Sequence, residues 1–352
     1  MNNENQLPFC PNINNNALAS VFKFKAATYK FYWFLGIVEE IEKGNKIVEK
    51  KKIFASMISN AWYPVNYFKL SFGSQDHLAL IINELYNTTS LSLSDDKRKI
   101  FNKLAKSKSN NILKNLYHFD NLVPYRFLSP WFKTKKNDNG KSVYTASQKD
   151  FKNTLYRLYE EKIIVNDNWF EYIRLNAKII KDYIFWNLAL FIQKRNPSTP
   201  DVINKLVKPA KRNSLTKQRN QFWNVFLKHK PETKCIFTKE PLQINNYHVD
   251  HFIPYSFVSH DLIWNLVPIN SSFNSSKSNR LPSLDKHFKD FYNIQCEAID
   301  VFGNKMPKKF KEEYLSVFPN FDTYQGIGFD KYKDVITPLV TVAHNNGFDF
   351  LK

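Results

Sequence analysis

The chain has 352 residues, of which 43% are hydrophobic and 16% aromatic, and this composition excludes an intrinsically disordered protein. The formal net charge of +19 favours polyanionic partners such as nucleic acid, although a Lys- and Asn-rich composition from an AT-rich genome would produce a similar charge. The three cysteines are widely spaced and form neither a disulfide framework nor a CxxC pair, which is typical of a reducing compartment.

The N-terminal stretch MNNENQLPFC has no basic segment followed by an apolar one, so we expect no signal peptide. The most apolar early run, residues 31–38, is far shorter than the roughly 20 residues that a membrane span requires. These features predict a cytoplasmic protein with no membrane partner.

The first 230 residues are predicted to form a mostly helical domain. Apolar residues recur at helical spacing in four ranges, namely 16–40, 50–62, 75–90 and 95–118. The polar segment 133–142 predicts an exposed loop. A long helix is expected to begin at Asn166 or Asp167, either of which can cap it, and to end at Asn196-Pro197, because the residue before a proline disfavours helix.

A basic segment ends this first part. Between Asn204 and Lys234 there are nine Lys and Arg residues and one acidic residue, Glu232, and the pattern of residues 215–230 is helical. We expect its cations to contact DNA phosphates without reading sequence. The candidates are Lys208, Lys211 and Arg212.

After Cys235 the apolar pattern changes to short extended segments. Residues 245–254 (NNYHVDHFIP) predict one strand and residues 265–269 (NLVPI) a second. Residues 271–280 (SSFNSSKSNR) predict a short helix, capped by Ser271 or Ser272 and stopped by Leu281-Pro282. Two or three further helices are expected to pack on this unit. The predicted fold class is therefore α+β, mainly α, with boundaries at 1–230, 231–285 and 286–352.

This strand-strand-helix unit carries the residue types that phosphodiester hydrolysis requires. Mg²⁺ prefers oxygen ligands and keeps several waters, so the Asp250 carboxylate and the Asn274 amide oxygen would suffice as protein ligands beside a substrate phosphate. A histidine can take a proton from water near neutral pH, and His251 is the candidate. In an extended chain His251 is expected to point away from Asp250.

These residues resemble the HNH, or ββα-metal, nucleases, and most closely the HNH domain of the RNA-guided CRISPR type II effector nucleases. The resemblance lies in CIFTKEPL (235–242), VDHFIPYSF (249–257), WNLV around Asn265 and NSSKSN (274–279), with Asn265 14 residues after His251 and Asn274 nine after Asn265. It implies roles for six residues: Asp250 and Asn274 as metal ligands, His251 as general base, Asn265 as a brace for the loop that presents the histidine, and Lys277 and Arg280 near the DNA backbone.

Departures from the family pattern guide the expected cofactor. Many HNH proteins hold the motif with two CxxC pairs on a structural zinc, but Thr238 stands three residues after Cys235, so we expect no structural zinc. Asn274 stands where colicin-type nucleases have a histidine, which favours Mg²⁺, with Mn²⁺ as a substitute. His248 and His260 are expected to be surface histidines rather than ligands.

The split RuvC-like half and the arginine-rich bridge helix of the CRISPR effectors are not evident in this chain. The sequence therefore predicts a free-standing bacterial HNH endonuclease of restriction or anti-phage defence, which cleaves DNA, expected to be double-stranded, with Mg²⁺. Three alternatives stay open: a homodimer, a nuclease subunit that is active only within a larger defence complex, and a catalytically silent nucleic-acid-binding module.

Overall fold

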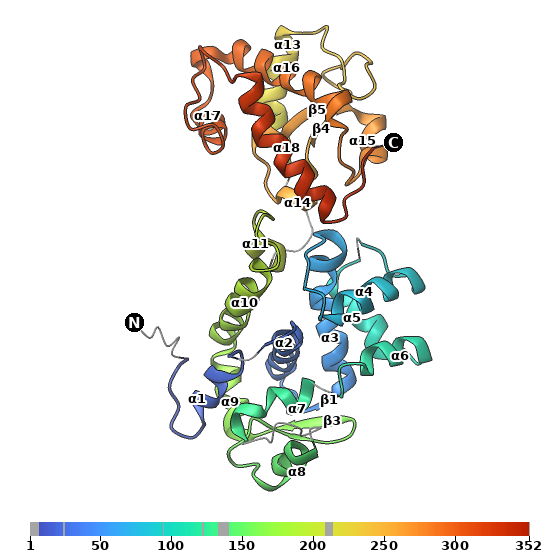
Figure 1. The fold of residues 1–352 in the computed structure, drawn as a ribbon, viewed down its shortest axis with the longest axis vertical. Helices are drawn as coiled ribbons and strands as arrows, with labels where there is room; N and C mark the ends of the chain where they lie inside the picture. Colours follow the sequence, from blue (N-terminus) through green and yellow to red (C-terminus); the bar gives the residue numbers. More distant parts are fainter. Residues whose placement is uncertain are drawn as a thin grey trace. The chain divides into compact units, whose positions relative to one another are not determined.

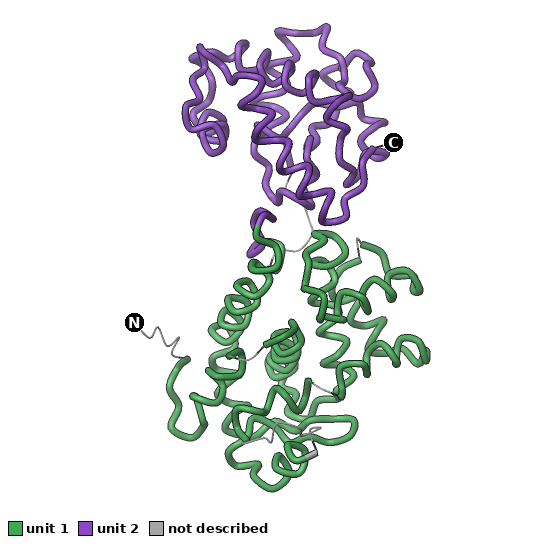
Figure 2. Tube along the Cα trace, viewed as in Figure 1, with its two compact units in different colours: residues 1–197, 205–210 green, residues 198–204, 211–352 purple. Residues whose placement is uncertain are grey.

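The computed structural model describes residues 7–23, 25–93, 95–121, 123–132, 141–207 and 214–351. They form two compact units (Figure 2): unit 1 comprises residues 1–197 and 205–210, and unit 2 comprises residues 198–204 and 211–352. Helix predominates and the strands are short (Figure 1), so the chain is α+β and mainly α, as predicted. No helix in the described ranges combines the length and apolar character needed to cross a membrane.

Unit 1 combines helices with a three-stranded sheet. The strands β1 (Ile47–Glu49), β3 (Lys162–Val165) and β2 (Tyr156–Leu158) pair antiparallel in that order. The helical segments are α1 (Asn15–Ser20), α2 (Tyr29–Glu42), α3 (Lys50–Trp62), the π-helix η1 (Tyr63–Tyr67), α4 (His77–Thr88), α5 (Lys97–Lys106), α6 (Asn110–Tyr117), α7 (Val123–Phe127), the 3₁₀ turn η2 (Ser129–Trp131), α8 (Lys141–Lys149), α9 (Asp167–Leu175) and α10 (Ala177–Gln193). The unit boundary falls inside α11 (Val202–Val207).

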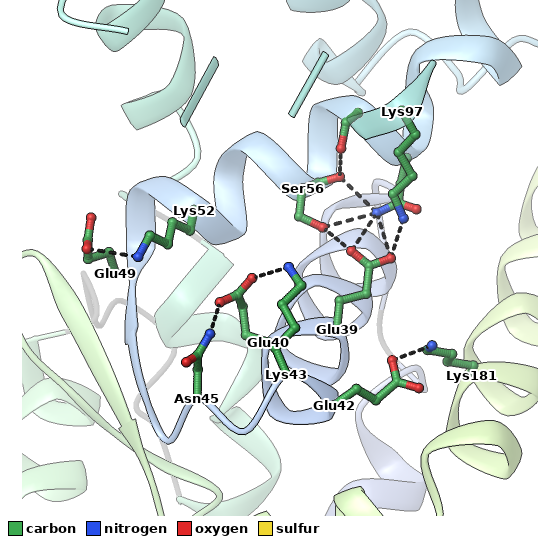
Figure 3. A network of polar contacts seen from close by, with 12 residues as sticks. Glu39, Glu40, Glu42, Lys43, Asn45, Glu49, Lys52, Ser56, Lys97 and Lys181 are labelled. Atoms are coloured by element: carbon green, nitrogen blue, oxygen red, sulfur yellow. Dashed lines mark hydrogen bonds and ion pairs between the residues drawn. The ribbon is translucent and has the colours of Figure 1, made fainter. Parts of the chain in front are cut away.

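Helix α2 is the centre of unit 1 and packs against α3, α9 and α10. Its apolar side chains are almost entirely buried. Its C-terminal turn carries three glutamates that lie close to this core and pair with lysines. Figure 3 shows the ion pairs there: Glu39 with Lys97 of α5, Glu40 with Lys43, and Glu42 with Lys181 of α10. Glu39 also accepts a hydrogen bond from Ser56 of α3. The carboxylates thus tie α2 to three neighbouring helices.

Several predicted helices of unit 1 are divided in the structure. The ranges 16–40 and 95–118 each contain two helices, and the long helix from Asn166 is interrupted at Asn176. Asn166 does cap α9, as predicted, by accepting from two backbone N–H groups. The Asn176 side chain donates to the Tyr172 carbonyl, a local bond of the kind that competes with helix continuation. Of the predicted loop 133–142, residues 133–140 lie outside the described residues, and Lys141 begins α8.

Unit 2 contains a two-stranded antiparallel sheet of β4 (Tyr247–His251) and β5 (Leu266–Asn270). Its helical segments are α12 (Thr216–Gln218), the π-helix η3 (Arg219–Trp223), α13 (Asn224–His229), α14 (Tyr255–Val258), the 3₁₀ turn η4 (Ile263–Asn265), α15 (Ser271–Lys277), α16 (Leu284–Phe302), the 3₁₀ turn η5 (Gly303–Lys305), α17 (Lys308–Leu315) and α18 (Phe329–Asn345). Residues 214–229, which the sequence analysis places in the first domain, group with unit 2 because Phe222, Trp223 and Phe226 join its core.

Helices α16 and α18 support the strands of unit 2. Phe291 of α16 stacks on Phe252, with ring centroids 4.0 Å apart. Gln295 of α16 donates to the Leu266 carbonyl at 2.6 Å, and the Tyr332 hydroxyl of α18 donates to the Trp264 carbonyl. Most aromatic side chains of these two helices are buried in the core of unit 2. Together with Gln295 they fix the backbone at both ends of the segment between β4 and β5.

Gly36 of α2 permits the close approach of α3 and generates the first prediction. A Cβ at this position would lie 2.9 Å from Ile53 Cγ2 and 3.3 Å from Ile53 O. Overpacking of this kind costs about 1–3 kcal/mol, more than the roughly 1 kcal/mol that alanine gains in helix propensity. We therefore expect Gly36→Ala to lower the free energy of unfolding, measured by urea denaturation.

Gly328→Ala is the matched control, because a Cβ there has no neighbour within 4 Å and the backbone φ is −62°. It should change stability by no more than about 0.5 kcal/mol. A Gly36→Ala protein as stable as the wild type would contradict the close-packing argument.

Candidate functional site

Strands β4 and β5 and helix α15 form a continuous unit that positions the candidate site residues. In the β4–β5 pair Asp250 lies opposite Val267 and His251 opposite Leu266. Helix α15 follows β5 directly, and its cap is Asn270, whose side chain accepts from the Ser272 N–H at 3.0 Å. The predicted cap, Ser271 or Ser272, was therefore wrong by one or two residues, since the last strand residue is itself a capping type.

A buried ion pair joins α15 to the end of β4. Lys277 Nζ lies 2.9 Å from Asp250 Oδ2, and the two side chains are 1% and 4% exposed. The same ammonium donates to the His251 carbonyl at 2.6 Å. Lys277 was expected near the DNA backbone; the structure gives its ammonium internal acceptors that the sequence did not indicate, and a phosphate contact stays a prediction.

Asn274 lies one turn before Lys277 and faces the same strand. Its Nδ2 is 3.1 Å from Nδ1 of His248. His248 and Asp250 are two residues apart on β4 and so share one face of the strand. The two expected metal ligands, Asp250 and Asn274, are therefore on the facing sides of the β4–α15 contact. His248 is exposed, as expected, yet it contacts one of them.

The contacts of His251 determine which ring nitrogen carries the hydrogen. The ring is fully buried, and Nε2 lies 3.1 Å from both the His260 carbonyl and Asp261 Oδ1. Both of these atoms are acceptors, so Nε2 carries a hydrogen, and in the neutral ring Nδ1 is the nitrogen with the lone pair. Among the described residues Nδ1 has no hydrogen-bond partner.

Nδ1 of His251 also lies 4.0 Å from Asp250 Oδ1. The expectation that the two side chains point in opposite directions was therefore wrong. His251 is the last residue of β4, and strand alternation no longer fixes its direction where the chain leaves the sheet.

A tight turn brings the two acceptors back to His251. Ser259 ends α14 in the left-handed region, with a φ of 59°, and His260 and Asp261 follow it. The Asp261 backbone is anchored in turn, because Gln218 Nε2 donates to its carbonyl at 3.1 Å. Asp261 was not predicted as a site residue, since a lone carboxylate ten residues after the histidine has no recognisable pattern.

Asn265 closes the loop that follows the histidine. It is fully buried, its Oδ1 accepts from the Ile253 N–H and its Nδ2 donates to the Ile253 carbonyl, both at 2.9 Å. The Asn265 carbonyl also accepts from the Phe252 N–H at 2.7 Å. These contacts hold the backbone of Phe252 and Ile253, directly after His251, in place. Arg280 Nη2 donates to the Ser276 carbonyl at 2.6 Å, at the end of α15.

The donor set of the site fits a hard cation. Within the described ranges, no three side chains from His, Cys, Asp and Glu cluster as metal ligands would. Asp250 and Asn274 instead offer one carboxylate and one amide oxygen, which is sufficient for Mg²⁺ when waters and a phosphate complete the shell. Cys235 is buried, and its Sγ accepts from the Asn270 N–H at 3.4 Å, beside the cap of α15.

The basic segment is only partly described. Lys208, Lys211 and Arg212, the expected phosphate contacts, lie outside the described residues. Within the described part, Arg219 stacks its guanidinium over the Tyr247 ring, 4.9 Å from the centroid. Tyr247 begins β4, so this cation lies next to the hairpin of the site.

Comparison with known proteins agrees with this geometry. A family model described as HNH endonuclease matches residues 235–283, which include all the candidate residues of β4, β5 and α15. No curated protein and no solved structure is found to match the chain. The match indicates nuclease activity and a nucleic-acid substrate for this segment, and HNH nucleases generally use a divalent metal ion.

The Asn265 brace generates the second prediction. Asn265→Ala removes both side-chain bonds and leaves the Ile253 N–H and carbonyl buried without them, at a cost of about 1–3 kcal/mol for each group. We expect the free energy of unfolding of unit 2 to fall by about 2–6 kcal/mol, measured by urea denaturation. Asn293→Ala, at an exposed position of α16, is the control; equal losses in both variants would refute the brace.

Proposed function

We propose that the β4–β5–α15 site hydrolyses phosphodiester bonds of double-stranded DNA with Mg²⁺ as its cofactor. The arrangement of His251 carries this proposal. One ring nitrogen is held by two acceptors, and the other keeps a lone pair with no partner among the described residues, 4.0 Å from the Asp250 carboxylate. A base held in one tautomer beside a metal-ligand carboxylate is what activation of water requires.

In this proposal Nδ1 of His251 takes a proton from the attacking water. The imidazolium that forms keeps its Nε2 hydrogen on the Asp261 carboxylate, which stabilises the new positive charge. Asp250 and Asn274 would hold the Mg²⁺, which when bound supplies positive charge to the phosphate oxygens and the leaving oxygen. In-line attack with loss of the 3′ oxygen leaves a 5′ phosphate.

Lys277 acts as a positioning residue in this scheme. Its ammonium contacts the Asp250 carboxylate and the His251 carbonyl, so it sets the orientation of the carboxylate relative to the base. Arg280 and the cations of the basic segment, Lys208, Lys211 and Arg212 among them, contact the DNA backbone in our proposal. Binding of that kind weakens steeply with salt. The resemblance to bacterial defence nucleases favours a role in restriction or antiviral defence.

One observation favours a second candidate, a nuclease subunit that a partner activates. The His251 ring and the Lys277 side chain are 0% and 1% exposed, so in this conformation the base has no solvent-exposed surface. Water and a phosphate group reach Nδ1 only after a local opening, which DNA or a protein partner would induce.

The third prediction tests the base. We expect purified wild type to nick supercoiled plasmid in Mg²⁺ or Mn²⁺ and not in EDTA, and His251→Ala to be slower by about 10²–10⁴-fold. His229→Ala, at an exposed histidine of α13, is the control and should nick at the wild-type rate. Undiminished nicking by folded His251→Ala would refute the proposal, whereas inactivity of wild type that a partner protein reverses would favour the second candidate.

The fourth prediction concerns Asp261. Asp261→Asn keeps the shape of the side chain but removes the charge that faces the imidazolium. We expect the single-turnover cleavage rate to fall by about 10–100-fold, with the Mg²⁺ concentration for half-maximal rate unchanged because Asp261 is not a metal ligand. Asp322→Asn, in a surface turn of unit 2, is the matched control. A shift in the Mg²⁺ requirement without a rate effect would contradict the positioning role.

A further inference from the structure

Unit 1 contains a pocket that the nuclease proposal does not use. It has a volume of about 820 Å³, within the range of roughly 300–1,000 Å³ that small-molecule sites occupy. Its wall comes from the chain before α2 and from the start of α2, from the start of α4, and from the region between α6 and η2. Three segments distant in the sequence therefore build one concave surface within a single unit.

The residues that line this pocket carry positive charge without carboxylates. Among the described residues, the lining includes four basic side chains and two imidazoles, Lys23, Lys25, Lys30, Arg126, His77 and His118, and no Asp or Glu. The two acidic residues adjacent to lining residues are used elsewhere in the fold. Asp76 accepts from the Thr28 and Leu78 N–H groups, and Asp120 pairs with Lys50 at 2.6 Å.

Lys30 is the most constrained of these cations. It is partly buried, and its ammonium donates to the Val21 carbonyl at 3.1 Å. Burial and the nearby Arg126 guanidinium lower the pKa of Lys30 to about 8, so both act against the charged form of this side chain. An anion between Lys30 and Arg126 would favour the charged form.

Aromatic rings lie beside the cations. His77 and His118 stack with ring centroids 5.2 Å apart, and Tyr29 packs edge-on against Phe119, also at 5.2 Å. All four line the pocket, and the two histidines are exposed. A flat heterocycle can stack on such a surface, so the pocket offers surfaces for both a phosphate and a base.

We propose that this pocket binds a free nucleotide, with Lys30 and Arg126 on its phosphates and the His118 ring against its base. A nucleotide combines multiple negative charges with a planar ring system in a volume that the pocket accommodates. This inference is independent of the nuclease proposal, because it involves no residue of unit 2. It gives unit 1, which has no motif, a ligand-binding role.

Isothermal titration calorimetry on the full chain in EDTA tests the proposal. The probes are ATP, adenosine and inorganic phosphate. We expect ATP to bind at one site per chain, with adenosine weaker by about tenfold or more because it lacks the charged groups, and inorganic phosphate to compete with ATP. No ATP binding, or equal affinity for ATP and adenosine, would overturn the proposal.

Variants locate the site. Lys30→Met/Arg126→Gln should weaken ATP binding by about tenfold or more, whereas Lys106→Met/Arg98→Gln, which makes the same charge change on exposed positions of α5, should change it less than about threefold. Arg126→Gln alone, at an exposed position, gives the same direction if the double variant fails to fold. Equal weakening in both double variants would overturn the site. A third result would also overturn the proposal: wild type does not bind ATP, and the Lys30 variant loses binding to a single-stranded oligonucleotide. These cations would then be contacts for a DNA backbone.

Discussion

The pair of contacts from Lys277 to Asp250 Oδ2 and to the His251 carbonyl fixes how α15 lies on β4, and the candidate site depends on it. Burying two opposite charges costs desolvation energy that their attraction only roughly offsets, so such a pair is weak evidence for stability. Its value here is positional. With Lys277 on Asp250, the residue one turn earlier in α15, Asn274, is directed to His248, and a carboxylate and an amide come to face each other from two elements. A neutral residue in place of Lys277 would leave the register of α15 on the strand less determined.

The second constraint is the segment between β4 and β5, which must hold a histidine in one tautomer. Asn265 binds both backbone groups of Ile253, so the chain leaving His251 is fixed. The turn at Ser259 then returns the Asp261 carboxylate to Nε2. The stack of Phe252 on Phe291 and the bond from Gln295 to the Leu266 carbonyl anchor the same segment from α16. The C-terminal helices are thus part of the apparatus that orients the base, although they supply none of its atoms.

The sequence predicted the parts of the site that follow from local spacing. Asp250 and His251 end the predicted first strand and Asn274 lies in the predicted helix, and both elements are present. Asn265, predicted to begin the second strand, ends the turn just before it. Contacts that depend on the tertiary fold could not be predicted from the sequence. Composition marks Lys277 as a surface cation, and only the tertiary fold shows its internal acceptors; Asp261 contacts the histidine only because of the turn at Ser259. In the same way, the helical pattern of residues 215–230 shows that one face is buried but not which core receives it, and strands of three or four residues in unit 1 are too short for alternation to be recognised.

The distribution of charge in unit 1 bears on whether the excess of Lys and Arg reflects only the base composition of an AT-rich genome. If base composition were the whole cause, Lys and Arg side chains would be spread over the surface. Many of them would then lie near a carboxylate, because the chain has 32 acidic residues for 51 basic ones. At the end of α2 this is what happens, because Glu39, Glu40 and Glu42 each contact a lysine. At the other end of the same helix, Lys30 lies in a pocket whose described lining has three more basic side chains and no carboxylate, and the neighbouring Asp76 and Asp120 have partners elsewhere. The two ends of one helix therefore differ in the carboxylates that lie near their cations. Binding of an anionic ligand at the start of α2, as proposed above, would explain this difference. The phosphate groups of the ligand would supply the negative charge that the described lining residues do not.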